Sequence, residues 1–137
     1  MPGDFLMKKD YKKIILDLNE TKDQRIQAAF KLENIADDAS ITAMGKALLS
    51  DPSPIVRHEC AFSLGETASP KEAGPYLMKA IEQDESIFVV HEALMALGTL
   101  GDSSFISFVK KFLYDSRKDV AESAEIALQR LTTDYAE

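Results

Sequence analysis

Two histidine-glutamate dipeptides are the residues in this 137-residue sequence whose types and spacing are best suited to chemistry. They are His58-Glu59 and His91-Glu92, which lie 33 residues apart and contain both histidines of the chain. Imidazole nitrogens and carboxylate oxygens together form a donor set that suits non-haem iron, with coordination positions left open for oxygen or water. The fixed interval between the pairs raises the question of whether the fold brings them together.

This interval belongs to a repeat that runs through the sequence. Four similar segments close on leucines that are 32, 33 and 31 residues apart, and they read "RIQAAFKL", "RHECAFSL", "VHEALMAL" and "AESAEIAL". A second apolar segment precedes each of them, namely "YKKIILDL", "ITAMGKALL", "EAGPYLMKAI" and "SFISFVKKFL". The repeated unit is therefore predicted to be helix-turn-helix, with no alternating pattern that would favour strands.

Local signals for helix starts support this division. In "DPSP", Ser53 is expected to cap a helix and Pro54 to occupy its first position, where a missing N–H costs nothing. We expect one domain over residues 1–137, with repeats at approximately 8–36, 38–67, 70–100 and 102–134. Units of this kind bury their apolar faces by stacking, which produces a right-handed solenoid. The sequence thus resembles the HEAT-repeat family, in the short variety found in bilin lyases, and the predicted fold is an all-α solenoid of four HEAT-like helical hairpins.

Helical geometry indicates where the histidines point. At 100° per residue, Val56, Cys60 and Leu64 form one apolar stripe that must face the core, and His58 lies off this stripe. In stacked hairpins the second helices run side by side, with axes roughly 8–10 Å apart. We therefore expect His58 and His91 to be neighbours on one exposed face.

The neighbouring positions predict a pocket. Phe62 and Gly65 follow His58 by four and seven residues, and Met95 and Gly98 follow His91 in the same way. Glycine inside a helix costs roughly 0.5–1 kcal/mol relative to alanine, so both glycines need a reason. Space beneath a metal ion or substrate is one reason, and close helix packing is the other.

Repeat duplication alone would explain similar residues in every copy. At the histidine position, however, the outer repeats carry Ile26 and Glu122, and at the next position they carry Gln27 and Ser123. The histidine-glutamate pair is thus confined to the two central repeats, which favours metal binding over inherited similarity.

Composition narrows the classes of partner and location. The net charge of -7 and pI near 4.9 argue against nucleic acid or an anionic membrane surface, and they fit a basic partner or a cationic substrate. A single cysteine, Cys60, excludes an internal disulfide and suits a reducing compartment. Without a candidate membrane span or signal sequence, the cytoplasm is the expected location.

A closer resemblance covers roughly residues 25–132. The stretches "RHECAFSLG", "VHEALMALGTLGD" and "DVAESAEIALQRL", with the interval between the pairs, are similar to one half of the deoxyhypusine hydroxylases. These are HEAT-repeat enzymes with two similar halves, each carrying a histidine-glutamate pair in its two central repeats. The family binds a di-iron centre between the halves, activates dioxygen and hydroxylates the aminobutyl side chain of deoxyhypusine on a translation initiation factor.

The resemblance implies an iron-dependent monooxygenase with Fe²⁺/Fe³⁺, or another divalent metal, as cofactor. It makes His58, His91 and Glu92 direct metal ligands, and it places Glu59 near the metal or on the cationic amine of the substrate, in a catalytic role. Phe62 and Met95 would keep the pocket dry. This chain supplies two pairs where the family has four, so a di-iron site requires a homodimer.

Two other functions stay open at this point. The chain would also suit a non-catalytic HEAT scaffold that binds a protein or peptide on its concave face, with the pairs as recognition residues. The short repeat class also fits a bilin-lyase-like or chaperone role. Metal content distinguishes the enzyme from both alternatives.

Overall fold

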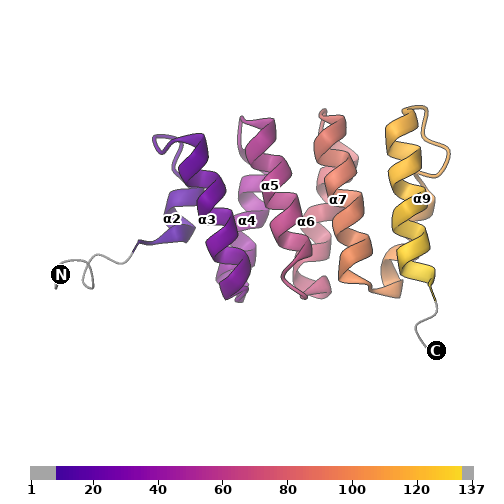
Figure 1. The fold of residues 1–137 in the computed structure, drawn as a ribbon, viewed down its shortest axis with the longest axis horizontal. Coiled ribbons are helices and arrows are strands. Elements are labelled where there is room, and N and C mark those ends of the chain that lie inside the picture. The colour runs from indigo at the N-terminus through magenta and orange to yellow at the C-terminus, as the bar shows by residue number, and fades with distance from the viewer. Residues whose placement is uncertain (1–8, 134–137) are drawn as a thin grey trace.

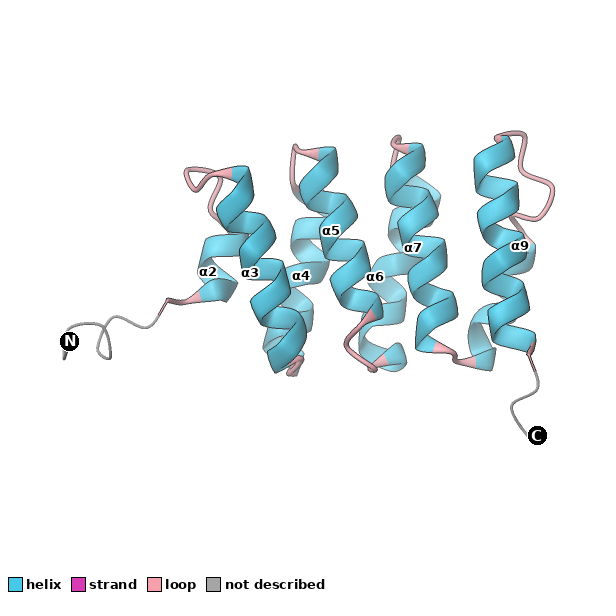
Figure 2. Ribbon diagram, viewed as in Figure 1, coloured by secondary structure: helices cyan, strands magenta, loops and turns pink. Residues whose placement is uncertain are grey.

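The computed structural model describes residues 9–133, and every regular element in this range is helical (Figures 1 and 2). The helices are α2 (Tyr11–Leu16), α3 (Lys22–Ile35), α4 (Asp38–Ser50), α5 (Pro54–Gly65), α6 (Pro70–Gln83), α7 (Ile87–Leu100), the 3₁₀ helix η1 (Ser103–Phe105), α8 (Ile106–Lys110) and α9 (Lys118–Thr132). The all-α prediction is confirmed. No helix within the described range has the length and apolar character that crossing a membrane would require.

These elements form a solenoid of four helical hairpins, as the repeat predicted. The hairpins are α2 with α3, α4 with α5, α6 with α7, and the short η1–α8 segment with α9. Figure 1 shows the second helices α3, α5, α7 and α9 side by side in one row, with α2, α4 and α6 in a row behind them. Within the front row α5 packs between α3 and α7, and α9 packs on α7. Residues of successive repeats are thus brought together on one face.

Polar residues fix the start of each of the two central second helices. The hydroxyl of Ser53 accepts a hydrogen bond from the N–H of Val56, and Pro54 opens α5. Ser86 caps α7 in the same way, through the N–H of Val89. Because both helices begin at equivalent positions, each histidine is the fifth residue of its helix.

The apolar stripe of the second helices is the core of the solenoid. Val56, Cys60, Ala61 and Leu64 on α5 are completely buried, as the helical periodicity predicted. The equivalent residues of α7, including Val89, Ala93 and Leu97, are also fully buried. On α5 and α7, one face therefore builds the core, and the histidines lie off that face.

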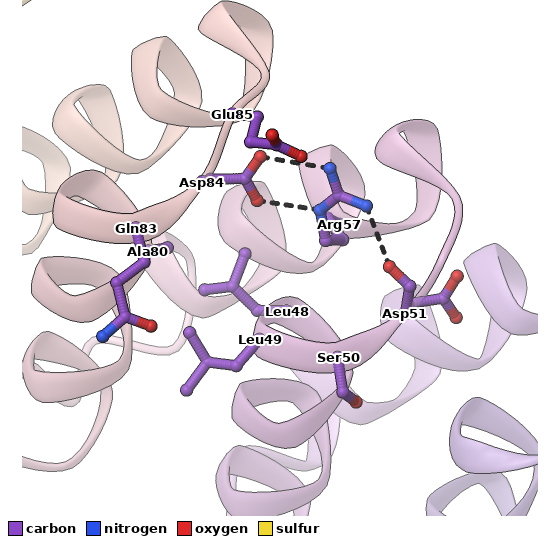
Figure 3. Close-up of a pocket in the computed structure, with 9 residues that line it drawn as sticks. All are labelled: Leu48, Leu49, Ser50, Asp51, Arg57, Ala80, Gln83, Asp84 and Glu85. Carbon is purple, nitrogen blue, oxygen red and sulfur yellow. Dashed lines mark hydrogen bonds and ion pairs between the residues drawn. The ribbon is translucent and has the colours of Figure 1, made fainter.

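Arginine-aspartate pairs join successive hairpins at the end of the solenoid where the hairpin turns lie. Nε of Arg25 lies 2.8 Å from Oδ2 of Asp51, and Nε of Arg57 lies 2.8 Å from Oδ2 of Asp84. Arg57 also donates to the backbone carbonyl of Asp51, so that it spans the hollow of about 230 Å³ shown in Figure 3. The carboxylate of Asp84 raises the pKa of Arg57, because it accepts a hydrogen bond from the guanidinium. Both arginines are thus structural cations that tie each repeat to the next.

The outer first helices are shorter than the sequence pattern predicted. The stretch "SFISFVKKFL" was expected to be one helix, whereas it begins with η1 and winds after Lys110 through turns whose N–H groups bond to the third residue back. In the first hairpin, α2 comprises only six residues. The outermost parts of the expected domain, residues 1–8 and 134–137, lie outside the described residues, as do the limits at 8 and 134 of the outer repeats.

Candidate metal centre

The central contact of the site joins His58 on α5 to Glu92 on α7. Nε2 of His58 lies 3.0 Å from Oε1 of Glu92, and the two side chains are 29% and 18% exposed. Both side chains are thus half-buried, off the core stripe. Because a carboxylate only accepts hydrogen bonds, this geometry makes Nε2 of His58 a donor, or a site for a cation shared with the glutamate.

The second ring nitrogen of His58 faces the glutamate beside it in the sequence. Oε2 of Glu59 lies 3.5 Å from Nδ1 of His58. Nδ1 is buried and makes no hydrogen bond with any residue of the described chain. His58 is therefore flanked by two carboxylates. Its Nε2 contacts Glu92, whereas its Nδ1 lies near Glu59 without a hydrogen bond.

His91 is oriented differently, toward α9. Its Nδ1 lies 2.6 Å from the hydroxyl of Ser123. That hydroxyl in turn donates to the backbone carbonyl of Asp119 at 2.7 Å. His91 thus has a serine where His58 has a glutamate, although the two histidines occupy equivalent positions of the repeat.

The structure therefore places the four predicted ligands along the row without gathering all of them. It brings His58 together with Glu59 and Glu92, while His91 contacts the following helix. Across residues 9–133, no group of three or more histidine, cysteine, aspartate or glutamate side chains is arranged to hold one metal ion.

A hollow of about 260 Å³ lies beside this contact. Phe62, Gly65 and Met95, three of the predicted pocket residues, line it together with His91 and Glu92. Gly98, the fourth, is absent from its lining and packs against α9 instead.

The two glycines owe their place to close helix packing. A Cβ added at Gly65 would lie 2.7 Å from Cβ and 2.9 Å from Cα of Ala96 on α7. A Cβ at Gly98 would lie 3.3 Å from Cα of Ala127 on α9. Of the two reasons that the sequence left open, packing thus holds at both positions, and Gly65 borders the hollow as well.

A second hollow, of about 370 Å³, lies between α7 and α9. Its walls combine apolar side chains with acidic ones around His91, and its lining consists of Ile87, Phe88, His91, Asp119, Glu122, Ser123 and Ile126. Ser123 and Glu122 appeared in the sequence only as positions where the outer repeat departs from the central ones. The signal that would have found Ser123 is its position in the last repeat, which is equivalent to Glu59 and Glu92 in the two central repeats.

Large apolar side chains are exposed around the histidines. Phe88 is 75% exposed and Ile55 is 50% exposed, and both line a further hollow of about 290 Å³ with His58. Phe62, at 39% exposed, lies one turn further along α5. The polar contact of His58 and Glu92 is therefore framed by apolar surface that no described residue covers.

The repeats and the sequence define the class of this protein. A family model of HEAT repeats matches residues 41–129, and the chain belongs to this family. Within it, the chain is similar to deoxyhypusine hydroxylases. It is 36% identical to that of Schizosaccharomyces pombe over 118 residues and 33% identical to that of Drosophila melanogaster over 120 residues. The resemblance drawn from the sequence is thus confirmed.

The similarity extends to the fold. The structure of human deoxyhypusine hydroxylase in complex with glycerol matches with a TM-score of 0.83 at 29% identity, over 88% of this chain and 42% of the human one. The match to the S. pombe enzyme covers 85% of this chain but only 36% of that enzyme. The match to the Drosophila enzyme covers 87% of this chain and 39% of that enzyme. The complex of CpcE and CpcF of phycocyanin lyase from Nostoc sp. PCC7120 shares the fold, with a TM-score of 0.66 at 21% identity over 90% of this chain and 52% of that one.

Proposed function

We propose that this chain is a metal-dependent hydroxylase of the deoxyhypusine hydroxylase type, with iron as the metal and with a site that two copies of the chain complete. The observation that carries the proposal is the contact of His58 with Glu92 across α5 and α7, on the face that also carries His91. We also propose that residues 1–137 act as one domain in a reducing compartment such as the cytoplasm, where Cys60 stays a thiol.

The chemistry of the side chains fits iron. Two imidazoles and two carboxylates are the donor types of non-haem iron sites, and a carboxylate lies on each side of the His58 ring. A cation at this ring would relieve the buried Nδ1, which has no hydrogen bond, or replace the proton between Nε2 and Glu92. His58, His91 and Glu92 would hold the metal, and Glu59 would bind the metal or the cationic group of the substrate.

A second copy supplies what one chain lacks. No group of three suitable ligands forms within residues 9–133, and two copies together contribute four histidines and four glutamates at the two central repeats. A two-fold axis would bring the same face of both chains together. Ile55 and Phe88 offer apolar area for this contact beside His58, and burying such exposed side chains favours association.

The substrate we propose is a protein side chain with a cationic amine. Asp119 and Glu122 line the hollow next to His91, whose apolar walls include Ile87 and Phe88 and would accommodate the methylene groups of such a chain. Bound iron would supply the reductive activation of dioxygen. The chain's own part would be to bind the amine through its carboxylates, and to exclude water with Phe62 and Met95 at the hollow beside Glu92.

Metal analysis and mass measurement test the proposal together. Protein produced in iron-supplemented medium should contain about one iron per chain and have the mass of a dimer, and His58→Ala or Glu92→Gln should lose the iron. Glu82→Gln is the matched control, because Glu82 is exposed on α6, away from the proposed site, and pairs with Lys111 at 3.6 Å. Metal-free protein despite adequate iron would reject the enzyme and favour the peptide-binding scaffold. Iron that persists in both variants would reject the assigned ligands.

A further inference from the structure

Ser123 makes two short contacts that one hydroxyl hydrogen must serve. Its Oγ lies 2.6 Å from Nδ1 of His91 and 2.7 Å from the carbonyl oxygen of Asp119. The carbonyl can only accept a hydrogen bond, and the serine hydroxyl has a single hydrogen to donate. The side chain is 2% exposed, so bulk water does not compete for either contact.

These contacts determine where the proton of His91 lies. If the hydroxyl donated to Nδ1, its lone pairs would face the Asp119 oxygen at 2.7 Å without a hydrogen between them, which is repulsive. With the hydroxyl donating to Asp119, Nδ1 of His91 must carry the hydrogen and donate it to Ser123. The lone pair of the neutral ring is then on Nε2. The ring of His91 borders both the hollow with Glu92 and the hollow with Glu122.

We propose that Ser123 is a positioning residue that holds His91 in its Nδ1–H form and leaves Nε2 available as a ligand or proton acceptor. This inference deepens the proposed function and rests on it for the identity of the ligand. Hydrogen bonds of this kind from the far nitrogen of a metal-binding histidine fix its tautomer and ring orientation. Ser123 performs this task from α9. In the described solenoid, α9 is the one second helix with a glutamate, Glu122, at the position equivalent to His58 and His91.

His58 differs from His91 in this respect. Its Nε2 faces Glu92 at 3.0 Å, and no serine orients its ring. The two histidines are therefore inequivalent, since His91 is prepared as a neutral ligand and His58 is held between acidic groups. Position 123 is one source of this difference, because the equivalent residue on α7 is Glu92.

Long-range ¹H–¹⁵N spectra of metal-free protein report the tautomer of each histidine directly. The expected result is that His91 in the unsubstituted chain is protonated at Nδ1, and that Ser123→Ala shows a mixture of both neutral forms. Ser63→Ala is the matched control, because Ser63 is a fully buried serine on α5 whose hydroxyl donates to Glu33 at 2.8 Å. It should leave the His91 signals unchanged. Protonation of His91 at Nε2 in the unsubstituted chain would overturn the inference, whether or not Ser123→Ala folds.

Titration with Co²⁺, as a probe for the proposed iron site, measures the consequence. Removing the partner of a ligating histidine typically weakens metal binding by roughly 10–100-fold, and we expect a loss in this range for Ser123→Ala and none for Ser63→Ala. Equal affinities in Ser123→Ala and the unsubstituted protein would overturn the positioning role. If the tautomer behaves as expected while neither protein binds Co²⁺ or iron, the metal-dependent function fails and the orientation of His91 by Ser123 stands.

Discussion

Arg25 holds Asp51 in a bidentate ion pair that is almost completely buried, with Nε 2.8 Å from one carboxylate oxygen and Nη2 3.1 Å from the other. The two side chains are 5% and 1% exposed. Asp51 also accepts the N–H of Ser53, the residue that caps α5. One ion pair therefore links the start of α3 to the start of the helix that carries His58.

Removal of this carboxylate should destabilise the whole solenoid. We expect Asp51→Ala to lower the free energy of unfolding by about 3–5 kcal/mol, because it leaves the buried guanidinium of Arg25 without its partner. Urea unfolding followed by circular dichroism measures the loss. Glu82→Ala is the control, since its pair with Lys111 is exposed, with the side chains of Lys111 and Glu82 58% and 51% exposed, and should contribute almost nothing. Equal stability of both variants would show that the buried pair has no such role.

The glycines of the second helices offer a second test of stability. Gly65→Ala should destabilise the protein by about 1–3 kcal/mol, because the added Cβ would collide with Cα and Cβ of Ala96 and push α5 away from α7. Gly98→Ala should cost less, since the closest atoms there, Cδ of Arg130 at 3.2 Å and Cα of Ala127 at 3.3 Å, are farther away than those of Ala96 at Gly65. Chemical denaturation of both variants checks the order. A more stable Gly65→Ala would mean that its helix propensity outweighs the contact.

The sequence was sufficient to predict the hairpins and the face of each second helix, because core periodicity and caps such as Ser53 are local signals. It predicted His58 and His91 on one face of neighbouring helices, but it did not define their side-chain partners, which are Glu92 for His58 and Ser123 for His91. Side-chain partners depend on the axial offset between packed helices, which no spacing along one chain reveals. The sequence also did not predict the shortening of α8, because its apolar pattern continues through the turns after Lys110.

Cys60 should be chemically inert in the folded protein. Burial raises the pKa of its thiol far above the usual range, so the reactive thiolate is essentially absent near neutral pH. We expect a colorimetric thiol reagent to modify Cys60 only at the rate at which the protein unfolds, and immediately in concentrated urea. Rapid modification of the native protein, with circular dichroism unchanged, would contradict the buried placement.

The acid sensitivity of the turn before α9 follows from one ion pair. Hydrogen bonds from Arg117 hold the pKa of Asp115 below its usual range. A depressed pKa contributes stability above the unfolded value of about 3.9, and this contribution is lost as the pH falls through the lower folded value. Asp115→Asn should therefore show a shallower fall in unfolding free energy below about pH 4. The effect should be small because Arg117 is 38% exposed, and an unchanged slope would exclude the pair as its source.

The exposed phenylalanine beside His58 tests the proposed contact between two chains. Phe88→Ser should shift the mass in solution from dimer to monomer and reduce the iron content, with little change in the stability of the single chain, because Phe88 is 75% exposed. Tyr114→Ser is the matched control, since Tyr114 is 94% exposed in the turn after α8. Sedimentation measures both masses. Dimers of equal strength in the two variants would place the contact on another surface.

The row of second helices has a direction along the chain, since each histidine contacts a residue of the helix that follows. Two histidine-glutamate repeats in succession therefore produce one histidine-glutamate contact between helices, because each such contact needs a histidine from one repeat and a glutamate from the next. Glu59 is left over at the N-terminal end of the pair and His91 at the C-terminal end. Inserting a further copy of the second repeat, residues 38–67, between the two central repeats would add one more histidine-glutamate contact between helices. The first glutamate and the last histidine of the row would keep their present surroundings.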